Sequence, residues 1–224
     1  MDSARASARA ARSRPAARHT LVDQRREWQQ RIQATLYHHG VPPRSWLLGA
    51  EARAWRTGLE LPPAAREQIR IALAVIDAHD AQLAPLDQEL REYAKRQPGC
   101  RALMGRYGIG PLTSVTIVAE LGDACRFGSS REAVRDAGLD ITVHQSDARR
   151  APGRLSRQGP SALRWALFEA AQCARRPSSP DHDYYVEAAA RLGGNRACLA
   201  VARKLLKRSF HMLRELGEEA LQPA

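Results

Sequence analysis

The chain has 224 residues, with 35 lysines and arginines against 24 aspartates and glutamates and a formal net charge of +11. This excess of positive charge favours a polyanionic partner and does not choose between DNA and RNA. Nearly all the basic residues are arginines, whose planar guanidinium suits phosphate, although a GC-rich genome would produce the same bias. The sequence has no apolar run that could cross a membrane and no signal-peptide core, so we expect a cytoplasmic protein without a membrane partner.

Residues 1–20 carry five arginines and one aspartate, with no apolar periodicity. This composition, rich in alanine, serine and arginine, predicts a disordered basic tail. A transit peptide has the same composition and is the alternative interpretation.

Residues 21–98 are predicted to form a helical arm. Apolar residues near helical spacing indicate one helix from Leu21 to His39 and a longer one after Pro62-Pro63. The longer pattern has a coiled-coil seam from Ile69 to Tyr93, and Pro85 should kink or split it. Ser45 is the candidate cap of a short helix between the two. The seam needs a partner, either the Leu21–Leu36 helix or a second chain.

Pro98-Gly99 marks the end of the arm. Residues 99–224 are numerous enough for one compact helical domain. Near its start, Gly108 and Gly110 permit positive φ angles, and Pro111 suits the first turn of a helix expected over Leu112–Leu121. The N-terminus of that helix would present N–H groups to a phosphate. This arrangement is typical of a helix-hairpin-helix. A plain helical hairpin, with glycines for packing, is the alternative.

Ser146 lies just before a segment dense in positive charge. No acidic residue occurs from Ala148 to Phe168, and five arginines follow the serine, namely Arg149, Arg150, Arg154, Arg157 and Arg164. A hydroxyl beside so many guanidinium groups indicates a surface that binds the phosphate backbone of nucleic acid.

Several short motifs follow one another in a recognisable order. They are Gly108–Pro111, Glu120–Asp123 with Arg126-Phe127, Asp136–Leu139, Gly153–Gly159, Leu163–Leu167 with Glu169–Ala171, and Ala200–Leu206. Together they cover roughly residues 103–213. This order resembles the C-terminal domain of a bacterial insertion-sequence transposase family that includes the Piv DNA invertase and the bridge-RNA-guided recombinases.

The resemblance implies a two-part recombinase joined by a helical coiled coil. In such proteins an N-terminal RNase-H-like domain holds divalent metal on four acidic residues, and a C-terminal serine attacks DNA and forms a phosphoserine link. Ser146 matches that serine, although Asp147 stands where many members have glycine. No strand pattern with an embedded acidic residue precedes the arm, so we expect a truncated chain that binds no metal or other cofactor by itself. The family's arm also leads us to favour self-association.

Other residues with reactive or metal-binding side chains give weaker evidence for a functional site. The four cysteines lack metal-ligand spacing. Asp77, His79 and Asp80 are expected to be solvated helix positions. The segment Asp181-His182-Asp183 follows two prolines and predicts a helix start more strongly than a metal site. Ser161 is expected to cap the helix that follows it.

Three large apolar residues and one histidine near the serine could also contact nucleic acid or assist catalysis. Trp165, Leu167 and Phe168 are expected to lie in the core rather than to stack on bases. His144, two residues before Ser146, would share its face in an extended segment and is the candidate general base.

The sequence therefore predicts a mainly α protein, with a helical coiled-coil arm followed by a compact helical domain containing a helix-hairpin-helix-like element. We expect a DNA-binding transposase or site-specific recombinase that acts by serine-dependent strand transfer. Its expected partners are DNA, a guide RNA and a second copy of the chain. The alternatives are a non-catalytic nucleic-acid-binding remnant of such a transposase and a gene fragment without a selected role.

Overall fold

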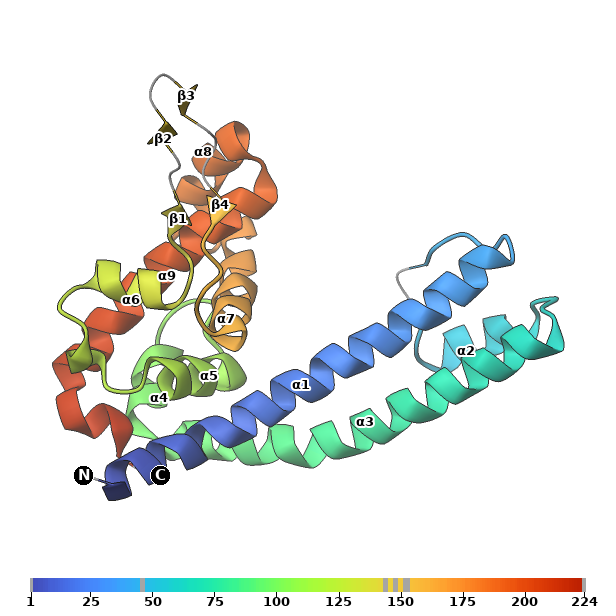
Figure 1. Cartoon of the computed structure of the whole chain (residues 1–224), viewed down its shortest axis with the longest axis horizontal. Helices are drawn as coiled ribbons and strands as arrows, with labels where there is room; N and C mark the ends of the chain where they lie inside the picture. Colours follow the sequence, from blue (N-terminus) through green and yellow to red (C-terminus); the bar gives the residue numbers. More distant parts are fainter. Residues whose placement is uncertain (1, 45–46, 143–144, 147–148, 151–153, 223–224) are drawn as a thin grey trace. The chain divides into compact units, whose positions relative to one another are not determined.

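The computed structural model describes residues 2–44, 47–142, 145–146, 149–150 and 154–222. Helices make up most of it, as the sequence predicted (Figure 1). The chain divides into two compact units, residues 17–88 and residues 1–16 together with 89–224. Among the described residues, no helix combines the length and the apolar character needed to cross a bilayer.

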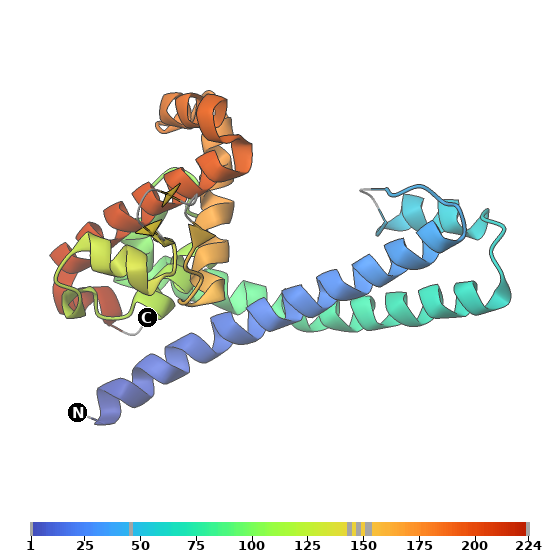
Figure 2. The ribbon, with the colours of Figure 1, turned by 45° about the horizontal axis from the view of Figure 1, so that its top comes forward.

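The unit of residues 17–88 is built on an antiparallel pair of long helices. Helix α1 (Asp2–His38) and helix α3 (Pro63–Arg96) lie side by side, and the short helix α2 (Ala50–Thr57) precedes α3 (Figures 1 and 2). Arg18 Nε lies 2.5 Å from Asp87 Oδ1, and Arg25 Nε lies 2.5 Å from Asp80 Oδ1. Because the partner numbers fall on α3 as they rise on α1, the two helices run in opposite directions.

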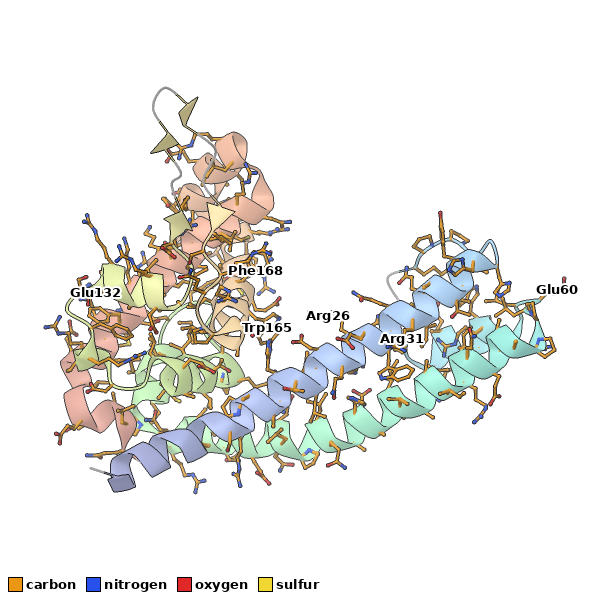
Figure 3. The ribbon with its side chains drawn as sticks, viewed as in Figure 1. Arg26, Arg31, Glu60, Glu132, Trp165 and Phe168 are labelled. Carbon is orange, nitrogen blue, oxygen red and sulfur yellow. The ribbon has the colours of Figure 1, made fainter. Side chains whose placement is uncertain are left out.

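An apolar core fills the space between these helices. Its buried members are Ile32, Leu36, Leu47, Leu61, Ala65, Ile69, Ala72 and Ile76. The first part of the seam that the sequence predicted on α3 is therefore buried by the same chain. Arg31 projects from α1 with its guanidinium carbon 4.6 Å from the Trp28 ring centre, a cation–π distance (Figure 3).

Three sequence expectations differ from the structure here. Residues 2–20 belong to α1 rather than to a disordered tail, and alanine and arginine, which are strong helix formers, account for this. Pro85 lies inside α3, which continues through it, so the expected split does not occur, and the expected kink stays a prediction. Helix α2 has Gly49, not Ser45, as its N-cap, and Ser45 lies outside the described residues.

In the other unit, the described residues form six further helices, α4 to α9, which pack against one another, and four strands of two residues each. The long C-terminal helix α9 contributes a continuous buried face that includes Val201, Leu205, Phe210 and Leu213. The helices before it are α4 (Pro98–Met104), α5 (Pro111–Leu121), α6 (Ser130–Asp136), α7 (Ser161–Gln172) and α8 (His182–Leu192), and α9 itself is Gly194–Leu216. Short 3₁₀ turns complete the unit, namely η1 (Ala124–Arg126), η2 (Cys173–Arg175) and η3 (Gly217–Leu221).

Two helix starts test the capping expectations. Helix α8 begins at His182 with Asp181 in the N-cap position, so helix initiation is the correct interpretation of that acidic segment. Helix α7 begins at Ser161 with Pro160 as its N-cap, so the expected capping role of Ser161 is wrong. The Pro160 carbonyl already accepts a hydrogen bond from the Arg164 amide at 3.3 Å, which makes Ser161 the first helical residue.

Asp181 forms a buried ion cluster that ties the start of α8 to α9. Its side chain is 5% exposed and lies 3.0 Å from Lys204 Nζ and 2.6 Å from Arg208 Nη1. Burial by itself would raise the pKa of Asp181, but the hydrogen bonds from Arg208 and Lys204 outweigh burial and hold the pKa below its usual value. The ion cluster therefore stabilises the folded domain where the carboxylate is charged.

We expect Asp181→Asn to lower the free energy of unfolding by about 1–3 kcal/mol at pH 7, because two cations lose their charged partner. The folded-state pKa is below the unfolded value of about 3.9, so this contribution is present above that pH and lost as the pH falls through the folded value. Urea unfolding at pH 7 and at pH 3 should show the difference between variant and parent shrinking in acid. The exposed neighbour Asp183→Asn is the control, and an equal loss for both would contradict the assignment.

Candidate functional site

The segment that carries Ser146 contains two short antiparallel strand pairs, which together we call the ribbon (Figure 1). Strand β1 (Ile141–Thr142) pairs with β4 (Arg154–Leu155), and farther along β2 (Gln145–Ser146) pairs with β3 (Arg149–Arg150). Ser146 is the register partner of Arg149, and Gln145 is the register partner of Arg150. Directly opposed residues are the closest across such a pair. The backbone thus brings the candidate serine next to the first two arginines of the cationic segment.

The root of the ribbon is a close contact between two backbone segments. A Cβ atom built on Gly159 would lie 1.9 Å from the Asp136 carbonyl oxygen and 2.5 Å from the Ala137 carbonyl carbon. Gly138 has a φ of +64°, and a Cβ there would lie 2.7 Å from the Gly159 nitrogen. Both glycines are therefore required, because no side chain fits between the segments that begin and end the ribbon.

Hydrogen bonds continue the ribbon ladder down to this root. The Ser156 amide donates to the Asp140 carbonyl at 3.2 Å, and the Arg157 amide donates to the Gly138 carbonyl at 3.2 Å. The Ser156 hydroxyl also donates to Asp140 Oδ1. Arg157 itself is exposed and has a φ of +55°, a strained conformation for a residue other than glycine.

Two arginines from neighbouring helices hold the same root. Arg164 on α7 donates to the Ala137 carbonyl at 3.2 Å and to the Gly159 carbonyl. Arg203 on α9 donates through Nε to the Leu139 carbonyl at 2.6 Å. Burial lowers the pKa of both guanidinium groups below their usual value. Arg164, which the sequence placed among the nucleic-acid contacts, is thus engaged inside the domain.

The Gly-Ile-Gly turn joins α4 to α5, and its two glycines have different roles. Gly108 has a φ of +87°, and a Cβ on it would lie 2.6 Å from the Ala170 carbonyl oxygen of α7. Gly110 is the N-cap of α5 with a φ of −88°, and a Cβ there would meet no atom within 4 Å. The packing interpretation therefore accounts for Gly108, whereas Gly110 leaves the start of α5 open. The helix-hairpin-helix itself remains a prediction.

Other candidate groups are arranged as follows. Cys100 is fully buried, and burial raises the pKa of its thiol to about 12, so this thiol is unreactive. Leu167 lies in the core as expected, whereas Trp165 and Phe168 project from α7 and are half-buried (Figure 3). His144 lies outside the described residues. Among the residues that the structure describes, no group of three or more His, Cys, Asp or Glu side chains is placed to hold a metal ion.

Sequence reasoning missed Asp140, Gly159 and Arg203 as parts of the ribbon root. Gly159 and Arg203 did occur in the motifs Gly153–Gly159 and Ala200–Leu206, but nothing in the local sequence shows which backbone atoms they contact. Arg203 is 64 positions from its hydrogen-bond acceptor Leu139, so only the fold brings them together.

Comparison with known proteins places this ribbon and its root inside a defined domain. The family model described as "Transposase IS116/IS110/IS902 family" matches residues 100–186, a span that includes both glycines of the turn, Ser146 and all five arginines of the cationic segment. Residues 100–186 match the transposase domain of this family. The resemblance drawn from the ordered motifs is confirmed.

Individual relatives agree with the family match. The transposase for insertion sequence element IS1111A of Coxiella burnetii is 29% identical over 129 residues, which are 56% of this chain and 35% of the relative. A probable family 20 transposase of Pseudomonas aeruginosa is 25% identical over 116 residues, covering 52% and 34% of the two chains. The insertion element IS116 uncharacterized 44.8 kDa protein of Streptomyces clavuligerus is 27% identical over 143 residues, covering 62% and 35%. The chain spans about a third of the length of these curated relatives.

Proposed function

We propose that this chain binds DNA and supplies the serine nucleophile for strand transfer of an insertion sequence. The observation that carries the proposal is the register of the ribbon, in which Ser146 is opposite Arg149 within a transposase domain. The neighbouring sequence adds further arginines and, from Ala148 to Phe168, no carboxylate that would repel a phosphate.

The proposed chemistry is a phosphoryl transfer to the serine. The Ser146 hydroxyl oxygen attacks a DNA phosphorus, a serine–phosphate ester forms, and the bond from phosphorus to one sugar oxygen breaks. The hydroxyl proton passes to a base, for which His144 is the candidate, and the departing sugar oxygen takes up a proton. Arg149, Arg150, Arg154 and Arg157 would stabilise the negative charge on the non-bridging oxygens. Arg164 would instead act by fixing the ribbon root.

We propose no metal-dependent step for the residues of this chain. The described residues offer no suitable ligand cluster. The resemblance to two-part recombinases leads us to propose that an acidic metal-binding domain must accompany this chain when strand transfer occurs. A guide RNA is a further partner that the resemblance implies.

A denaturing gel tests the proposed chemistry. Protein would be incubated with labelled nicked or junction DNA and Mg²⁺, with and without the N-terminal acidic domain of a relative. A labelled band at the mass of protein plus DNA, which survives denaturation and needs the acidic domain, is the expected result. Binding without any adduct under either condition would refute the strand-transfer proposal and support the alternative, a non-catalytic nucleic-acid-binding role.

Electrostatic binding gives a second expected result. Contacts to phosphate dominate such an interface, so duplex DNA should bind with a Kd on the order of 10⁻⁴–10⁻⁶ M at physiological salt and weaken steeply as salt rises. Titration of labelled duplex at several salt concentrations measures this slope. An affinity independent of salt would contradict the proposal.

Self-association through the arm is also proposed. A hollow of about 400 Å³ on this unit is lined in part by Trp28, Ile32 and Ile71, and Ile71 is 44% exposed although apolar. We expect sedimentation to show a dimer at tens of micromolar, roughly a concentration at which micromolar affinities are visible. Ile71→Asp should shift the chain to monomer. A parent chain that sediments only as monomer would contradict the proposal.

A further inference from the structure

Side-chain hydrogen bonds join three turns of the unit of residues 1–16 and 89–224, and none of these turns contains a ribbon strand. The turn before α5 contacts the segment after α7 through Tyr107, whose hydroxyl lies 2.8 Å from Ser178 Oγ. The same segment contacts the start of α9 through Arg175, whose Nη2 donates to Asn195 Oδ1 at 3.3 Å. Two hydrogen bonds thus link three parts of the chain that lie up to 90 positions apart in the sequence, roughly residues 106 to 196.

This surface is rich in exposed arginine. The three-turn patch consists of Arg106, Tyr107, Arg175, Arg176, Asn195 and Arg196, all of them exposed. Arg106 adjoins Tyr107, and Arg196 adjoins Asn195, so the hydrogen bonds that join the turns also gather their arginines. Within the part of the chain that the structure describes, none of these four arginines has a carboxylate oxygen within the 4.0 Å of an ion pair.

Asp181, the acidic residue nearest in sequence to Arg176, does not offset this charge. Asp181 is 4% exposed and is already neutralised by Lys204 and Arg208. The sequences of the three turns add none, because residues 98–119, 170–180 and 188–214 contain no aspartate or glutamate. The flanking helices α7 and α8 carry the exposed Glu169, Asp183 and Glu187, but among the described residues no ion pair joins them to the patch. The patch itself therefore presents four unpaired guanidinium groups and no carboxylate.

The chemistry of the patch selects a partner with regularly spaced anions. Guanidinium groups bind phosphate oxygens through paired hydrogen bonds, and a fixed exposed tyrosine ring can pack against sugar or an unstacked base. An acidic peptide would offer fewer anions in a fixed spacing. We propose that the three-turn patch is a second contact surface for the phosphodiester backbone of nucleic acid, separate from the ribbon that carries Ser146. The inference rests on the proposed function, since it presumes that the domain engages nucleic acid.

Paired substitutions in the full chain test the patch. Arg176→Ala with Arg196→Ala removes two charges without breaking the Tyr107–Ser178 or Arg175–Asn195 hydrogen bonds. The matched control is Arg131→Ala with Arg135→Ala, which removes two exposed charges from α6. For duplex DNA, the slope of log affinity against log salt should become shallower by about 1.8 in the patch variant, at about 0.9 per lost phosphate contact. The control variant should keep the parent slope.

Three further measurements decide between the patch and the ribbon as the contact surface. Duplex RNA and single-stranded DNA are titrated in parallel, and a loss with any of these ligands that exceeds the control supports the inference and identifies the nucleic acid involved. Arg149→Ala with Arg150→Ala probes the ribbon. If only the ribbon variant weakens binding, the patch inference is wrong and the proposed function stands. If neither variant weakens binding more than the control, both the patch inference and the proposed DNA binding are wrong.

Circular dichroism melts confirm that each variant is folded. Arg176→Glu alone should weaken binding further than Arg176→Ala.

Discussion

Replacing Ser146 by alanine is expected to abolish the covalent protein–DNA adduct while DNA binding stays nearly unchanged. The hydroxyl oxygen is the atom that would bond to phosphorus, so its removal leaves no nucleophile at that place in the ribbon. Binding depends on many phosphate contacts, and the loss of one hydroxyl should change its free energy by less than about 1 kcal/mol. The denaturing gel measures the adduct, and the salt titration measures binding.

Ser161→Ala is the control for this experiment. Ser161 lies in the same acid-free segment and is exposed at the first position of α7, but it is outside the ribbon. Its variant should form the adduct at the parent level. An adduct that persists in Ser146→Ala and disappears in Ser161→Ala would show that the nucleophile has been assigned to the wrong serine.

Gly159→Ala is expected to destabilise the unit of residues 1–16 and 89–224 by at least about 3 kcal/mol, because the new methyl group would overlap backbone atoms. The Asp136 carbonyl oxygen would lie 1.9 Å from it, and the nearest atoms of Ala137 lie 2.5 Å and 2.8 Å away. These atoms belong to the main chain at the end of α6, so no side-chain rotation relieves the contact. The ribbon root would have to open, and the hydrogen bonds from Arg164 would be lost with it.

Gly110→Ala provides a matched glycine control. A Cβ at Gly110 meets nothing within 4 Å, and its φ of −88° is available to alanine. This variant should be within about 1 kcal/mol of the parent, or slightly more stable, because alanine restricts the unfolded chain. Urea unfolding of both variants measures the difference. Equal stabilities would contradict the backbone contact at Gly159.

The sequence by itself determined the helical class, the arm and the family of the C-terminal domain. Apolar spacing of three and four residues reports the face of a helix directly, which is why α3 was predicted near its observed bounds. For α5, Pro111 after Gly110 indicated the start of the helix. Motif order along the chain is likewise a property of sequence. The prediction of a disordered tail failed because low apolar content does not prevent alanine and arginine from forming a helix.

The tertiary structure decided which side chains serve the site and which serve the fold. The ribbon was not predicted, because four strands of two residues each are too short to show an alternating pattern. Arg164 looks in the sequence like any other arginine of the cationic segment, yet it holds the carbonyls of the ribbon root. Arg203 reaches that root from α9, and Tyr107 meets Ser178 across 71 positions. Contacts of this kind depend on the packing of helices distant in sequence, and local propensity carries no information about them.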